Sequence, residues 1–130
     1  MKYLQFSSLL FSTCVIHSFY VQNIIYHHLT LLVTILSILN HTYNRNNNDI
    51  IKIIDKIFAH YLYIHLTFID LPYIYFIQPI LIVCPIIILV IFIFEFIFIK
   101  HAVCLHFFLH ICSVIFIHLY IYYLEILYSK

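Results

Sequence analysis

The chain has 130 residues, 65% of them hydrophobic and 8% charged, and its formal net charge is +1. Soluble domains are typically about 25% charged, so six basic and five acidic side chains are too few to cover this much apolar surface in water. A net charge near zero with scattered basic residues excludes a nucleic-acid-binding surface. The composition therefore predicts a lipid bilayer as the partner of the chain, and no nucleic acid.

Glycine is absent from the whole sequence. Glycine normally supplies positive-φ turns, phosphate-binding loops and the elbows that present serine nucleophiles. Asp55, Asp70 and His60 or His65 have no spacing that supports a catalytic triad with a serine. We therefore expect that the protein is not an enzyme, with no catalytic residues, no cofactor and no soluble substrate.

The abundant residues also share a property of the genetic code. Ile, Leu, Phe and Tyr are encoded by AT-rich codons, and thymine at the second codon position always encodes an apolar residue. Low-complexity strings such as residues 61–65 are what T-rich DNA would encode. One hypothesis is therefore a dubious or orphan reading frame that was never selected for a function.

Residues 1–39 form an apolar N-terminal segment in which positions 3–39 carry no charge. A spanning helix needs about 20 residues. The segment predicts either one tilted span or two short ones, about 3–21 and 24–39, broken at Gln22 and Asn23. Lys2 followed by an apolar run also imitates a secretory signal, although serine and threonine residues dilute it.

Residues 40–49 are the one clearly polar segment, and we expect a solvated loop there. Asn40, His41 and Thr42 form a glycosylation sequon, which is a short and common match. The sequon directly follows the apolar run, so modification is not expected even in a lumenal loop.

Residues 50–70 are predicted to form an amphipathic helix that lies in the membrane interface, with Asp49 as its cap. Lys52, Asp55 and Lys56 recur at helical spacing on one face, and the opposite face is largely apolar. The alternative is a chance stripe in a compositionally biased chain.

Residues 71–99 are the most hydrophobic stretch, and a helix from about Pro79 to Phe98 would cross the bilayer core. Pro85 falls inside this helix and is expected to kink it. After a polar break at Lys100 and His101, residues 102–124 form another candidate span. The two spans predict a tight helical hairpin.

These elements predict an all-α fold with three or four transmembrane helices and poorly specified packing. With three spans, four Lys and Arg residues lie on one side and two on the other. With four spans the division is five against one, with both termini cytoplasmic. The charge rule favours four spans, whereas the weak hydrophobicity of residues 3–21 opposes it. The expected location is an internal membrane such as the endoplasmic reticulum.

Ten histidines are present, and His106 and His110 lie one helical turn apart, flanked by His101 and His118. Imidazoles in a membrane helix can bind a transition metal or haem. However, no HExxH motif occurs, and no nearby carboxylate is placed to orient either ring. We therefore predict no metal site. Glu95 is interpreted as an interfacial carboxylate, with a proton relay as the alternative.

The four cysteines lie in apolar runs without a CxxC pair and are expected to be small hydrophobic side chains in the membrane. The sequence thus predicts a small integral membrane protein with no inferable biochemical activity. One alternative is an interaction or accessory protein of the membrane, which the lack of small-xxx-small seams opposes. Another is a protein that handles metal, haem or protons through histidine.

Overall fold

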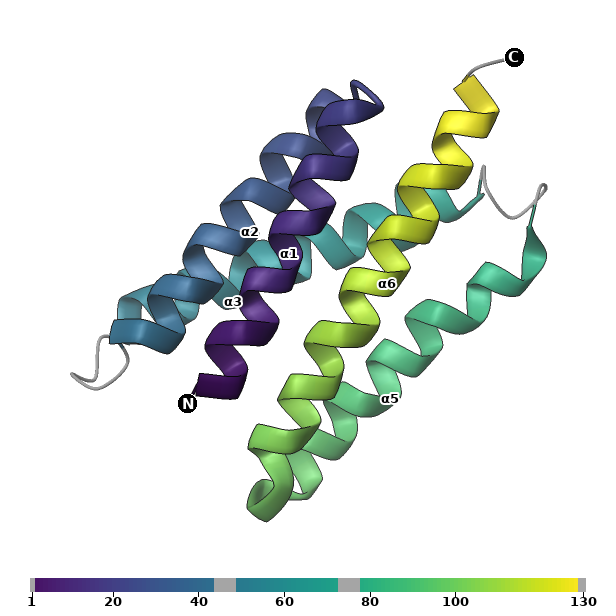
Figure 1. Ribbon diagram of the computed structural model, residues 1–130. Helices are drawn as coiled ribbons and strands as arrows, with labels where there is room; N and C mark the ends of the chain where they lie inside the picture. The colour runs from purple at the N-terminus through teal and green to yellow at the C-terminus, as the bar shows by residue number, and fades with distance from the viewer. Residues whose placement is uncertain (1, 44–48, 73–77, 129–130) are drawn as a thin grey trace. The chain divides into compact units, whose positions relative to one another are not determined.

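The computed structural model describes residues 2–43, 49–72 and 78–128, and these residues contain five α-helices and no strand. The prediction of an all-α fold is confirmed. The chain divides into two compact units, residues 1–64 and residues 65–130. The first contains α1 (Lys2–Tyr20), α2 (Ile24–Tyr43) and α3 (Asp49–Ile64). The second contains the π-helix η2 (His65–Asp70), the 3₁₀ segments η3 (Pro79–Ile82) and η4 (Ile99–His101), α5 (Val83–Ile97) and α6 (Ala102–Tyr128) (Figure 1).

Three helical stretches are long and apolar enough to cross a membrane: Ile24–Thr42, Pro79–Ile97 and Ala102–Leu127. α1 is not among them, because its serine and threonine residues lower its hydropathy. A multi-span helical architecture is therefore present in the described part of the chain.

The turn between α1 and α2 lies at the predicted break. It needs a left-handed residue, and the chain has no glycine to supply one. Gln22 adopts a left-handed backbone with φ of 56°. The N–H of Asn23 donates to Ser18 O at 2.9 Å and the N–H of Gln22 donates to Phe19 O at 3.1 Å. This is a Schellman motif, in which glycine is the usual left-handed residue. Asn23 Oδ1 then accepts the N–H of Tyr26 at 3.2 Å and caps α2.

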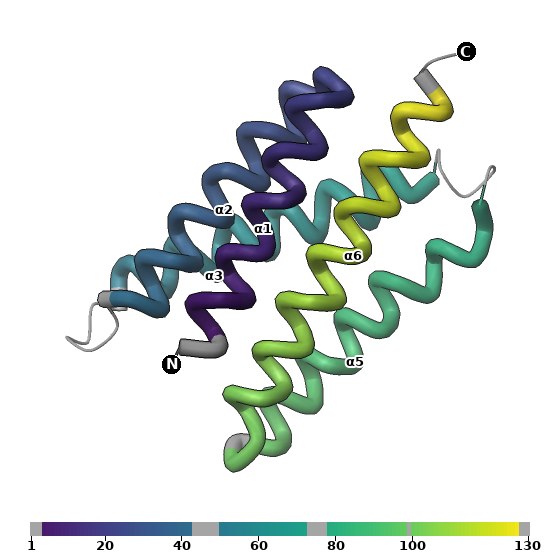
Figure 2. Tube along the Cα trace, in the orientation of Figure 1, coloured from purple at the N-terminus to yellow at the C-terminus, as the bar shows by residue number. Residues whose placement is uncertain are grey.

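α1 and α2 pack as an antiparallel hairpin (Figure 2). Buried positions recur every three or four residues along each helix, and many of them are small: Ser7, Phe11, Cys14 and Ser18 on α1, and Tyr26, Thr30, Val33 and Ser37 on α2. The hydroxyls of Ser8 and Ser37 form a hydrogen bond of 2.9 Å across the interface. Thr30 and Thr34, both buried and four residues apart, form a small-xxx-small pair. The expectation that the chain lacks such seams is therefore wrong for this hairpin.

α2 extends through Tyr43, so the first four residues of the predicted polar loop are helical. Asn40 is buried, and its Nδ2 donates to Asp55 Oδ2 of α3 at 2.7 Å. This hydrogen bond gives a polar side chain a partner inside the packing of α2 against α3, which the polar composition alone did not indicate. Residues 44–48 of the predicted loop lie outside the described residues.

α3 begins at Asp49 and continues directly into η2, so residues 49–70 are helical throughout. The face of α3 that is turned inward carries Ile51, Asp55, Phe58 and Leu62. Asp55 therefore lies on the packed side rather than with Lys52 and Lys56, as the sequence had suggested. A different, apolar stripe is exposed: Ile50, Ile53, Ile54, Ile57, Tyr61 and Ile64.

α5 and α6 form the second antiparallel hairpin (Figure 1). Pro85 is the third residue of α5 and follows the 3₁₀ segment η3, whereas the sequence placed it inside a continuous helix as a kink. In the first helical turn the missing N–H of proline has no intrahelical acceptor to lose, so this position tolerates it. α6 continues past Glu125 to Tyr128, and its C-terminal half carries buried residues that include Ile117, Tyr120 and Leu124.

Candidate functional site

The closed end of the α5–α6 hairpin brings one acidic and two basic side chains together. α5 ends where the N–H of Phe98 donates to Phe94 O at 2.8 Å, and the short η4 turn then reverses the chain. Glu95 in the last turn of α5 thereby faces His106 in the second turn of α6. His106 Nδ1 lies 3.0 Å from Glu95 Oε2 and 3.1 Å from Oε1. Both side chains are 26% exposed.

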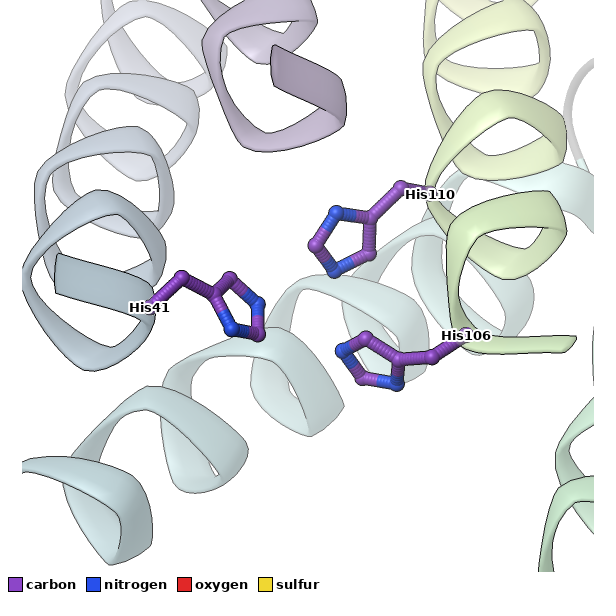
Figure 3. Close-up of side chains that lie close together, drawn as sticks. All are labelled: His41, His106 and His110. Atoms are coloured by element: carbon purple, nitrogen blue, oxygen red, sulfur yellow. The ribbon is translucent and has the colours of Figure 1, made fainter. Parts of the chain in front are cut away.

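His110 lies one turn beyond His106 on the same face of α6. The two imidazole rings have centroids 4.6 Å apart and are tilted by 56°. Figure 3 shows both rings projecting from successive turns of α6 toward the same side. His110 is buried, with 8% of its surface exposed. The pair is therefore partly shielded from solvent while remaining close to the hairpin turn.

Glu95 determines how the imidazole of His106 presents its nitrogens. When Nδ1–H donates to the carboxylate, the neutral ring carries its lone pair on Nε2. Metal-binding histidines very often donate their other N–H to a carboxylate in this way. The expectation that no carboxylate orients either ring is therefore wrong: the carboxylate is eleven residues away in sequence but adjacent across the hairpin.

The flanking histidines are not part of this cluster. His101 is exposed in the η4 turn. His118 lies eight residues beyond His110, about 12 Å farther along the helix axis. His41, also labelled in Figure 3, belongs to α2 in the N-terminal unit, where its carbonyl accepts Gln5 Nε2 at 3.3 Å.

His27 and His28 have separate partners, as their adjacent positions on one helix predict. His27 Nδ1 lies 3.2 Å from Val15 O of α1, and His28 Nδ1 lies 2.7 Å from Ile24 O of its own helix. Their rings meet edge to face with centroids 5.5 Å apart. They line an open hollow beside the α1–α2 turn. Each ring lies against a different backbone carbonyl, and their nitrogens do not converge on one ligand position.

Two residues of the rejected triad, His60 and Asp55, have separate partners. His60 Nδ1 lies 2.6 Å from Lys56 O of its own helix, and Asp55 is bound to Asn40. His65 and Asp70 do form a pair at 3.0 Å within η2. Burial raises the pKa of Asp70 from 3.8 to about 6 and lowers the pKa of His65.

The cysteines and the sequon are the remaining candidates for modification. All four cysteines are free thiols; Cys14 is buried, Cys104 is exposed, and Cys84 and Cys112 are intermediate. Asn40 of the sequon is buried in the last turn of α2 with its amide bonded to Asp55. A glycosyltransferase would need this amide exposed, so the fold disfavours modification there.

No protein-family model, curated protein or solved structure matches this chain.

Proposed function

We propose that the protein is a small multi-pass integral membrane protein without catalytic activity. The observation that carries this proposal is the surface of α5. Only 17% of the residues in the span Pro79–Ile97 are buried, and almost every exposed position in it is a large apolar side chain. Exposing such a surface to water would be strongly unfavourable, whereas hydrocarbon solvates it at no cost.

We further propose that α1 crosses the bilayer together with α2. The two helices are paired along their length, so α1 shares the environment of its partner. Its hydroxyls donate within the helix: Ser8 Oγ to Leu4 O at 2.8 Å, Ser12 Oγ to Leu9 O at 2.6 Å and Thr13 Oγ1 to Leu10 O at 2.6 Å. Satisfied hydroxyls lower the cost of placing this helix in lipid. The resulting topology has four spans.

Four spans place both chain termini on the same side of the membrane, and three spans place them on opposite sides. Epitope tags at each end, probed with protease in sealed vesicles, distinguish the two arrangements. We expect both tags to be cleaved together when the cytosolic face is accessible, with Lys2 and Lys130 on that face. Protection of one tag only would contradict the four-span topology.

The lengths of two of the three spans favour an internal membrane. Ile24–Thr42 in α2 and Pro79–Ile97, which joins η3 to α5, have 19 residues each, or about 28 Å at 1.5 Å per residue. The endoplasmic reticulum has a hydrocarbon core of about 27 Å, a few Å thinner than that of the plasma membrane. Hydrophobic matching of these two spans supports the endoplasmic reticulum as the location, and the 26-residue span Ala102–Leu127, about 39 Å long, would have to tilt in it.

An accessory role through helix contacts is the function that this geometry supports. The support comes from polar pairs at each helix contact, Ser8 with Ser37 and Glu95 with His106, which specify one register for each hairpin. The competing interpretation, a T-rich reading frame without a selected function, is supported by the composition. The two differ in whether a stable product accumulates in membranes.

A further inference from the structure

We propose that His106 and His110 bind one divalent first-row transition-metal ion, such as Zn²⁺ or Cu²⁺, at the closed end of the α5–α6 hairpin, with Glu95 as the positioning residue. Imidazole nitrogen suits these ions. Two histidines four residues apart on a helix present their rings on one face. Metal binding is a property separate from the proposed location in a membrane, since a hairpin could occupy the bilayer without binding any metal.

The distances fit two ligands to one ion. The ligand nitrogens of His106 and His110 lie within 4.8 Å of each other. Zn–N bonds of about 2.0–2.1 Å hold two nitrogens about 3.3–3.4 Å apart in a tetrahedral site, so a small rotation of the rings closes the pair on an ion. The carboxylate of Glu95, bonded to Nδ1 of His106, directs Nε2 of that ring toward the ion.

The position in the hairpin provides access for the ion and for water. His106 is four residues into α6, about 6 Å along the axis from Ala102. The turn itself carries exposed Lys100 and His101, which suit a membrane interface rather than the hydrocarbon centre. Water molecules at this depth can complete the coordination that two protein ligands leave open. Polar groups near the end of a span are also far less costly than at its middle.

Titration of the full-length protein in detergent micelles with Zn²⁺ tests the proposal. We expect wild type to hold one ion at least about tenfold more tightly than the double variant His106→Gln, His110→Gln, and each single variant to lose the tight site. Glutamine keeps the side chains polar and of similar size, and circular dichroism of each variant verifies that the helices remain. His101→Gln is the matched control, because it removes an exposed histidine five residues away and should leave the tight site unchanged.

Glu95→Gln separates a positioning role from direct ligation. Loss of the carboxylate partner should weaken binding about 10–100-fold. With Cu²⁺ as the probe, electron paramagnetic resonance should still show two nitrogen ligands in Glu95→Gln, with parameters like those of wild type at saturating metal. Shifted parameters would make Glu95 a ligand and overturn its assignment as a positioning residue. Equal Zn²⁺ affinity for wild type and the double histidine variant would overturn the site itself, and would leave the membrane assignment untouched because extraction assays measure that separately.

Discussion

Gln22 occupies a backbone conformation that β-carbon sterics disfavour. Its φ of 56° lies in the left-handed region, which costs an L-residue about 1–2 kcal/mol. The Schellman hydrogen bonds from Gln22 and Asn23 to α1 hold it there. The chain thus turns without glycine by storing strain in one residue, and the absence of glycine does not prevent tight helical hairpins.

Gln22→Gly should therefore stabilise the α1–α2 hairpin by about 1 kcal/mol, because glycine removes the steric cost and only part of the gain is lost to unfolded-state entropy. Unfolding in mixed micelles by added dodecyl sulfate, followed by circular dichroism, measures the difference. Val21→Gly is the control, since Val21 has a negative φ and glycine there should destabilise. Destabilisation by both substitutions would contradict the assigned conformation of Gln22.

Asp70 gives the molecule a pH dependence of defined sign. Its folded-state pKa of about 6 lies above the unfolded value of 3.8 because burial disfavours the carboxylate. The folded state therefore binds the proton more tightly, and stability falls as pH rises from about 4 to about 6. The lowered pKa of His65 acts in the opposite direction, reducing stability as pH falls below the ordinary histidine value.

Asp70→Asn isolates the contribution of the carboxylate. At pH 4 residue 70 is largely neutral in both folded proteins. Between pH 4 and pH 7 the free energy of unfolding of the variant should rise by up to about 2 kcal/mol relative to that of wild type. Partial solvent screening of the carboxylate keeps this change below the full value of the pKa shift. His65 Nδ1 lies 3.0 Å from the Asp70 carboxylate, so the comparison is made with His65→Gln in both proteins, which removes the titration of the histidine. The same dodecyl sulfate titration at the two pH values measures this change. A difference between wild type and variant that does not vary with pH would show that Asp70 ionises normally.

At the scale of helices, the two residues of each polar pair lie at nearly equal numbers of residues before and after a turn. Ser8 and Ser37 are nearly equidistant from Gln22, and Glu95 and His106 are nearly equidistant from Lys100. An antiparallel hairpin brings such positions opposite each other. The predicted break at Lys100 therefore contained the signal for the Glu95–His106 pair, which a search for nearby sequence motifs missed.

Other features of the elements needed the folded contacts. The polar residues around Asn40 predicted a loop. The hydrogen bond from Asn40 to Asp55 explains why α2 continues through this segment. The inward orientation of Asp55 likewise reversed the expected polar face of α3, because pairing with Asn40 outweighs the preference of a carboxylate for solvent. Helix existence and the positions of Pro79 and Gln22 could be predicted from the sequence, whereas buried polar partners could not.

The exposed stripe on α3 suits a helix that lies in the membrane interface, although it is not the apolar face that the sequence predicted opposite Lys52 and Lys56. Ile53 and Ile57 are 55% and 58% exposed, and the neighbouring Lys56 is also exposed. Large apolar side chains beside lysines favour insertion between headgroups and acyl chains.

The chain contains no tryptophan, so a single introduced indole reports depth without background. Ile57→Trp should emit at short wavelength and be quenched by lipids brominated on their acyl chains. The matched Lys56→Trp should emit as in water and resist quenching. Water-like emission from both variants would show that the stripe does not contact lipid.

At the scale of the whole molecule, two helical units combine strong lipid-facing character with a few specific polar contacts. α5 and α6 expose apolar side chains such as Phe96 and Ile115, at 85% and 55%. T-rich coding alone would supply the hydrophobicity of these helices. T-rich coding does not require that the product folds or persists. A functional membrane protein must be a folded product that persists in a membrane.

The most direct test is a small C-terminal epitope tag at the native locus, compared with a control in which the Met1 codon is changed. We expect a band near 15.7 kDa plus the tag, absent from the control and retained in the membrane pellet after an alkaline wash. A band released by the wash would contradict membrane integration. No band when degradation is blocked would show that the hydrophobic pattern records DNA composition rather than a functional membrane protein.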